Sequence, residues 1–207
     1  MQGYGFFLSA CMQTQLNLTE HSHLYHDGQV ASFTEQDDCF LSITGEVNSQ
    51  LERLMRHSLD ELSKKDCSSR VVLLQSHGGD IKSAMAIGQM IRGHQITTHI
   101  HGYCDSACGF VCIIGVQRTV SLDTVSERGS ELGFHQPKPL GGLRHCLGES
   151  HINPLLLNSV KSYLRSMLPK EGADAYYQEL MSSPCRGMDY LNATLLLEKG
   201  IATSVEW

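Results

Sequence analysis

The residues of this chain best suited to chemistry are one serine, one histidine and a pair of glycines, which stand in three short segments, residues 76–80, 102–108 and 133–137. A serine hydroxyl is a weak nucleophile at neutral pH, so it needs a base within hydrogen-bond reach and N–H donors aimed at the developing oxyanion. Ser106 is the candidate nucleophile and His135 the candidate base. Gly78, Gly79 and Ala107 are the candidate donors, because no side chain covers a glycine amide and the first amides of a helix lack intrahelical partners. Together these residues predict an acyl-transfer site.

The elements around these residues are predicted to bring them to one edge of a sheet. Arg70–Gln75 is a compact apolar run, which favours a buried strand with the glycine pair as its turn. From Asp80, a carboxylate suited to capping, apolar residues recur at spacings of three and four and predict a helix. Ile96–His101 alternates as a second strand, and Ser106–Ile114 is predicted to be a helix of small residues. Leu132–Phe134 predicts a third strand, which carries the histidine to the same edge.

The flanking sequence favours an α/β domain. Cys39–Val47 alternates as a first strand, and an amphipathic pattern from Leu51 to about Lys65 predicts a helix that follows it. Further helices are predicted from Pro154 to Pro169 and over about Glu171–Met181. Strands that alternate with helices in this way are typical of α/β folds.

This pattern resembles the Clp-type serine peptidases of the crotonase-like superfold, and within them the bacterial periplasmic branch. The resemblance spans roughly residues 40–203. The Gly78-Gly79 turn resembles the oxyanion turn of the family, Ser106 its nucleophile, and His135-Gln136-Pro137 its catalytic-histidine segment. The resemblance implies a ClpP/crotonase-like spiral of repeated β-β-α units with C-terminal helices over residues 39–207. It further implies a peptide or unfolded polypeptide substrate, a homo-oligomer and no cofactor.

The third catalytic residue departs from the family pattern. The family places an aspartate shortly before the start of a late helix, and the matching segment here is Met188-Asp189-Tyr190-Leu191. Counting back from Leu191 puts Met188 at the aspartate position and Asp189 one residue late. In a strand, an offset of one residue turns a side chain to the other face. A loop would absorb this offset, so Asp189 is the candidate orienter of His135, and the alternatives are a Ser–His dyad or a site without peptidase activity.

Two cysteines bracket the candidate nucleophile in a pattern that looks like the periplasmic branch. Cys104 and Cys108 are four residues apart, and on one helix their Cα atoms would lie roughly 6 Å apart, near the disulfide range. If Cys104 belongs to the turn, it can bond elsewhere. Ser106 has a simpler alternative role as a helix N-cap, and His135 as a buried histidine with satisfied hydrogen bonds. A second departure is His77, where the family has proline before the glycine pair.

Composition limits the compartment and the partners. The chain has 207 residues, enough for one domain with a substantial core, and its net charge of −6 without a Lys/Arg cluster argues against nucleic acid as a partner. Eight cysteines favour an oxidising compartment. The sequence contains no stretch of about 20 apolar residues, so no transmembrane helix is predicted.

The N-terminal segment bears on location. Leu8-Ser9-Ala10-Cys11 has the form of a bacterial lipobox, in which Cys11 would be lipidated, so a periplasmic or envelope-anchored bacterial protein is expected. Residues 1–38 are interpreted as a signal or lipobox remnant followed by a flexible arm. The arm carries His21, His23 and His26, but no metal site is predicted there because no Cys or carboxylate ligand has suitable spacing.

The leading hypothesis is an exported serine hydrolase that acts on peptide or acyl bonds through Ser106 and His135. A second hypothesis is an inactive module of the cell envelope that keeps the fold for binding. A third is an acyl-thioester enzyme of the wider superfold, in which the same amides would hold a thioester oxygen.

Overall fold

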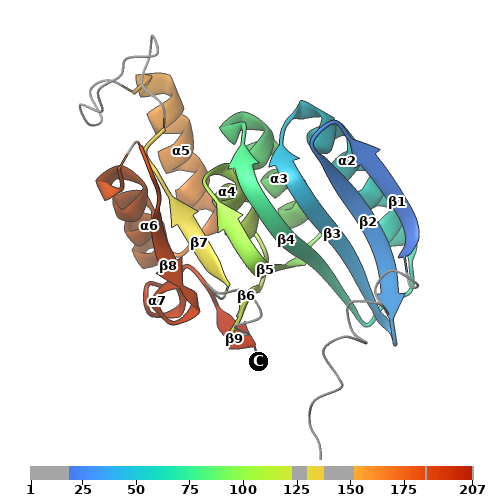
Figure 1. Ribbon diagram of the computed structural model, residues 1–207. Helices are drawn as coiled ribbons and strands as arrows, with labels where there is room; N and C mark the ends of the chain where they lie inside the picture. Colours follow the sequence, from blue (N-terminus) through green and yellow to red (C-terminus); the bar gives the residue numbers. More distant parts are fainter. Residues whose placement is uncertain (1–18, 123–129, 138–151, 185, 207) are drawn as a thin grey trace, which may run out of the picture.

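The computed structural model describes residues 19–122, 130–137, 152–184 and 186–206 (Figure 1). The strands are β1 (Thr19–Tyr25), β2 (Gly28–Glu35), β3 (Asp38–Val47), β4 (Ser69–Gly79), β5 (Thr97–Asp105), β6 (Arg118–Ser121), β7 (Glu131–Phe134), β8 (Asp189–Asn192) and β9 (Ser204–Glu206). The helices are α2 (Ser49–Lys64), α3 (Ile81–Gly93), α4 (Ala107–Cys112), α5 (Pro154–Met167), α6 (Lys170–Ser182) and α7 (Ala193–Glu198).

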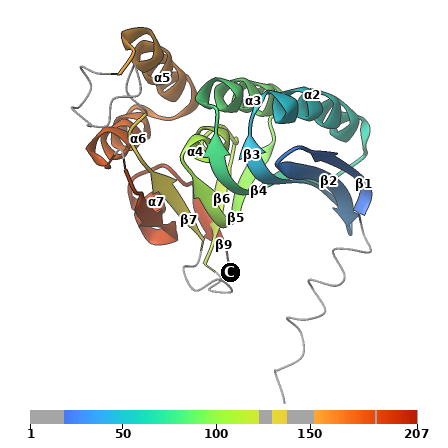
Figure 2. The same cartoon turned by 45° about the horizontal axis from the view of Figure 1, so that its top comes forward.

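The strands form one sheet with a branch. Its main path runs β1-β2-β3-β4-β5-β6-β9, while β7 pairs with β5 and β8 pairs with β7. The pairs from β3 to β6 are parallel, and β1, β2 and β3 pair antiparallel at one end. Figure 2 shows α2 and α3 side by side over one face of the sheet. The fold is therefore of the α/β class, as predicted.

Capping and apolar spacing explain why the covering helices form where they do. Asn48 Oδ1 accepts hydrogen bonds from the backbone amides of Gln50 and Leu51 at 2.9 and 3.0 Å and so starts α2. The buried face of α2 recurs every three or four residues: Leu51, Met55, Leu59 and Leu62. Asp80 Oδ1 accepts from the amide of Ser83 at 2.8 Å and starts α3 directly after the glycine pair that ends β4. The helix that follows β4 thus begins at the candidate site.

Strand β5 changes its partner at Gly102, and this branch positions the site. Before the glycine, Thr98–Ile100 pairs with β6, and after it Tyr103–Asp105 pairs with β7. Gly102 has φ +102°, a conformation that side chains rarely adopt, so glycine permits the change of direction. Because β7 runs parallel to the end of β5, the residues that follow both strands meet at one edge.

The expected flexible arm is wrong for residues 19–38. These residues form the β1–β2 hairpin and the start of β3, with Phe33 opposite Phe40 and their rings stacked 5.0 Å apart. The arm was expected because β1 is almost entirely polar and shows no apolar alternation. Its backbone pairing to β2 supplies the hydrogen bonds instead. The lipobox segment and Cys11 lie outside the described residues.

Over the described residues, the helices are too short or too polar to cross a membrane.

Candidate active site

Ser106 occupies a strained turn between β5 and α4. Its φ of 54° and ψ of −118° lie in a region that residues other than glycine rarely adopt, and such strain is concentrated at functional sites. The side chain makes no capping hydrogen bond to α4, so the N-cap alternative does not hold. Instead, Ser106 Oγ lies 2.6 Å from His135 Nε2. The sequence-predicted serine and histidine are thus in direct contact.

Covalent and backbone contacts hold this turn. Cys104 on β5 and Cys108 on α4 form a disulfide with Cα atoms 5.2 Å apart, which confirms the predicted pair and spans Ser106. The amide of Ser106 donates to the carbonyl of Gly133 on β7 at 2.7 Å. A second disulfide, Cys39–Cys67, joins the start of β3 to the segment before β4 and was not predicted.

Another cysteine lies near the nucleophile turn but has a different character. Cys112, at the end of α4, is buried as a free thiol, and burial raises its pKa to about 12. The thiol therefore stays protonated at neutral pH and is a poor nucleophile.

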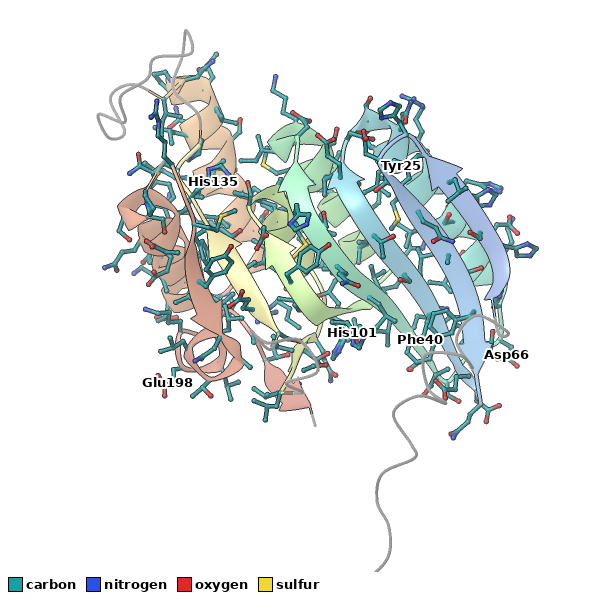
Figure 3. All side chains as sticks on the ribbon, viewed as in Figure 1. Tyr25, Phe40, Asp66, His101, His135 and Glu198 are labelled. Atoms are coloured by element: carbon teal, nitrogen blue, oxygen red, sulfur yellow. A yellow bond between two sulfur atoms is a disulfide. The ribbon has the colours of Figure 1, made fainter. Side chains whose placement is uncertain are left out.

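His135 directly follows β7, near α5 (Figure 3). Its Nδ1 lies 2.7 Å from the carbonyl oxygen of Gln136. A carbonyl only accepts, so Nδ1 carries the hydrogen, and Nε2 of the neutral ring accepts the hydrogen bond from the Ser106 hydroxyl. This tautomer is the one that a general base acting on serine requires.

The structure does not join Asp189 to His135. Asp189 is exposed and lies opposite Phe134 in the β7–β8 pairing. Its side chain is therefore on the face of Phe134 and not on the face of the next residue, His135. Met188 lies on the other face, since a Cβ built at Gly133 would come within 2.9 Å of Met188 Cγ. Residues 133 and 135 share a face of the chain. A methionine therefore occupies the side of the strand where the histidine lies, and the partner of Nδ1 is the Gln136 carbonyl, which was not predicted.

The glycine pair was predicted as a turn but forms the end of β4, and its two residues contribute in different ways. Gly78 has φ +87°, and a Cβ there would lie 2.4 Å from the carbonyl oxygen of Asp105 and 2.8 Å from the amide of Ala107. Its own amide donates to Ser76 Oγ at 3.0 Å, so Gly78 is a residue of close approach and its amide is already engaged. Gly79 and Ala107 both line the pocket beside Ser106, so their amides are the remaining candidate donors.

A pocket of about 440 Å³ opens over the serine and histidine. Its apolar wall comes from α3, α4, α5 and α6 together with the residue that follows Gln136: Ile81, Phe110, Leu156, Leu180 and Pro137. A cavity of this kind suits an apolar side chain of a substrate whose carbonyl lies against Ser106.

His77 stands at the rim of the same pocket. Its ring stacks on Tyr103 with centroids 4.2 Å apart, and Nδ1 lies 3.2 Å from Asp105 Oδ2. The residue that replaces the proline of the family therefore has a fixed orientation beside the nucleophile turn.

Comparison with known proteins shows which solved structures share this fold. No protein-family model matches the chain, and no curated protein matches it in sequence. The chain is similar in structure to a mutant of the membrane-bound stomatin-specific protease 1510-N, with a TM-score of 0.59 and 18% identity over 80% of this chain and 77% of the other. It is also similar to a mutant of ClpP1 from Listeria monocytogenes, with a TM-score of 0.53 and 16% identity over 81% of this chain and 90% of the other. The chain thus has the fold of the Clp-type peptidases, as its sequence predicted.

Proposed function

We propose that this protein is a serine hydrolase that cleaves peptide or acyl bonds with a Ser106–His135 dyad. One observation carries the proposal: Ser106 Oγ lies 2.6 Å from the acceptor nitrogen of His135, on a turn whose backbone conformation is rare for serine. A residue with no functional role gains nothing from this strain, which costs on the order of 1–3 kcal/mol.

The reaction follows from the protonation states. Ser106 Oγ attacks the substrate carbonyl carbon while its proton passes to His135 Nε2, and the carbonyl oxygen becomes an oxyanion. The amides of Gly79 and Ala107 donate to that oxyanion. The intermediate collapses, the bond to the leaving group breaks, and His135 returns the proton to that group. Water then attacks the acyl-enzyme by the same route, which releases the acid and restores Ser106.

The substrate class follows from the pocket and the fold. The apolar wall formed by Ile81, Phe110, Leu156 and Leu180 favours peptides with an apolar side chain next to the scissile carbonyl. One of the two structural neighbours is a protease by name, which supports peptide substrates. The fold shared with the Clp-type peptidases supports assembly of several copies of this chain, as the sequence resemblance implies. The two disulfides support an exported protein, because disulfides persist mainly in oxidising compartments.

A fluorophosphonate probe tests the proposal directly, because it reacts covalently only with an activated serine. Purified wild type is expected to be labelled at Ser106, as shown by peptide mapping, and the variants Ser106→Ala and His135→Ala are expected to lose labelling while keeping the melting temperature of wild type. Folded wild type that is not labelled at any protein concentration would count against a hydrolase.

A binding module is the second candidate, and one observation favours it. The partner of His135 Nδ1 is a neutral carbonyl, whereas the imidazolium formed in serine catalysis is normally stabilised by a carboxylate. In that case Ser106→Ala would leave every cellular phenotype of the protein unchanged.

A further inference from the structure

We propose that Gln136 is a positioning residue that takes the place of the missing carboxylate: its main-chain carbonyl orients His135, and its side chain anchors the residue to the end of α6. This inference rests on the proposed function and names the residue on which the base depends.

The first step is the hydrogen bond itself. Gln136 O lies 2.7 Å from His135 Nδ1, and His135 Nε2 lies 2.6 Å from Ser106 Oγ. A serine triad needs from its third member a fixed ring orientation and the hydrogen on Nδ1. The carbonyl of Gln136 supplies both, although it supplies no negative charge.

The second step is what holds this carbonyl. Among the described residues, the β7–β8 pairing ends at Phe134, so Gln136 is held by contacts outside the sheet. The side-chain amide of Gln136 donates to the carbonyl of Met181 at 2.6 Å, and its backbone amide donates to the carbonyl of Pro184 at 3.3 Å. The residue is therefore fixed at two points to the segment that ends α6.

The third step is the rigidity of the support. Ser183 is buried, and its amide and hydroxyl both donate to the carbonyl of Glu179, at 3.1 and 2.7 Å, which fixes the last turn of α6. Tyr176 of α6 packs edge-on against Phe134 and Phe110, with ring centroids 5.0 and 5.4 Å away. The helix that anchors Gln136 is thus packed against the strand that carries His135 and against the helix that follows Ser106.

Sequence alone gave no sign of this role. The Gln-Pro pair after His135 drew attention only through its resemblance to the histidine segment of the family. The acceptor is a backbone atom, and its anchors lie 45 residues away at Met181 and still further on at Pro184.

The test uses two substitutions that keep the shape of glutamine but cannot donate to the Met181 carbonyl. Gln136→Met adds no charge, and Gln136→Glu is the second variant in case the first does not fold. Gln178→Met, at an exposed position of α6, is the matched control. The second-order rate of fluorophosphonate labelling is expected to fall roughly 10- to 100-fold in both Gln136 variants, because a small misplacement of a catalytic group costs about that much. The control is expected to match wild type.

A second readout does not depend on activity. Nitrogen-15 NMR of the histidine rings, with the His135 signal assigned from His135→Ala, reports which ring nitrogen carries the hydrogen. Wild type is expected to show hydrogen on Nδ1, and the Gln136 variants a mixture of both tautomers. If wild type is labelled but neither the rate nor the tautomer changes in the variants, the role of Gln136 is overturned and the hydrolase stands. If wild type shows the expected tautomer and the variants lose it, yet no form is labelled, the proposed function fails and the positioning role stands.

Discussion

The nucleophile side of the site is closed by a covalent bond between residues four apart, whereas the base side is anchored only by hydrogen bonds, to a segment far away in the chain. Ser106 is enclosed by the Cys104–Cys108 disulfide and approached by the Gly78 backbone. His135 depends on Gln136, which is tied to Met181 and Pro184. The ring of His135 also faces a neutral carbonyl, where a serine triad has a carboxylate.

This difference has a chemical consequence. The backbone of Ser106 and of the glycine pair has positive φ, and the strain at Ser106 costs free energy of folding. In return, the reacting groups are fixed before substrate binds. A neutral acceptor fixes the imidazole but stabilises the imidazolium less than a carboxylate does, because charge-assisted hydrogen bonds are roughly twice as strong. We therefore expect substitutions on the nucleophile side to lower the labelling rate more than those around His135 Nδ1. We also expect that a carboxylate near Nδ1 would raise this rate.

The largest effect is expected for Gly78→Ala. A Cβ at this position would lie 2.4 Å from the Asp105 carbonyl oxygen, and φ is +87°. The turn must shift away from Ala107, so fluorophosphonate labelling should fall about 10²- to 10³-fold, as when an oxyanion donor is lost. Gly93→Ala is the control, because a Cβ there meets nothing within 4 Å. Equal labelling of both variants would mean that the glycine turn is not part of the site.

The next effect is expected when the Cys104–Cys108 disulfide is removed by two alanine substitutions. The bond closes a short loop, so the free energy of unfolding should fall by about 2 kcal/mol, and the labelling rate should also fall because the serine turn loses its clamp. The matched double variant at Cys39 and Cys67, 28 residues apart, should lose more stability, about 3.5 kcal/mol, but label normally while folded. Urea unfolding and labelling together distinguish the two disulfides, and unchanged labelling in the first variant would show that the clamp is only structural.

The same contrast explains how much could be predicted from sequence. On the nucleophile side, the Asp80 cap and the cysteine pair four residues apart are local signals, and the structure has both. The glycine pair was predicted as a turn and forms the end of β4 instead. The cap and the disulfide each join residues three or four apart, whereas the approach of Gly78 to Asp105 and Ala107 is a long-range contact. The resemblance to Clp-type peptidases added His135, which stands 29 residues from Ser106 and could not have been paired with it by spacing alone.

Long-range pairings account for what was missed. Strand β1 is polar, and only its pairing with β2 holds it in the sheet. The Cys39–Cys67 disulfide joins residues 28 apart, a pairing that cysteine positions alone do not determine. The role of Asp189 depended on the register of β7 against β8, where a shift of one residue reverses the face of every side chain.

Because of this register, Met188 is the position at which a carboxylate could be introduced on the side of His135. Met188 directly precedes β8 and borders Gly133, which lies on the same face of its strand as His135. Met188→Asp would bring a carboxylate to that face, and replacing a neutral acceptor by a charged one should raise the labelling rate about 10-fold. Met188→Asn is the control for shape without charge and should stay near the wild-type rate. A gain in both variants would point to a change in packing instead of charge.

The smallest effect is expected for Asp189→Asn, and it separates a dyad from a triad most cleanly. In a Ser-His-Asp triad, the corresponding change lowers kcat about 10⁴-fold because it imposes the wrong tautomer on the histidine. Here the Asp189 side chain is exposed and opposite Phe134, while the Gln136 carbonyl already fixes the hydrogen on Nδ1. The labelling rate should therefore stay within about twofold of wild type, with the same histidine tautomer by nitrogen-15 NMR. A loss of 100-fold or more would mean that Asp189 reaches His135 in the working enzyme and that the β7–β8 register changes when substrate binds. In that case Met188→Asp should bring no gain, because the two carboxylates would compete for a single ring nitrogen.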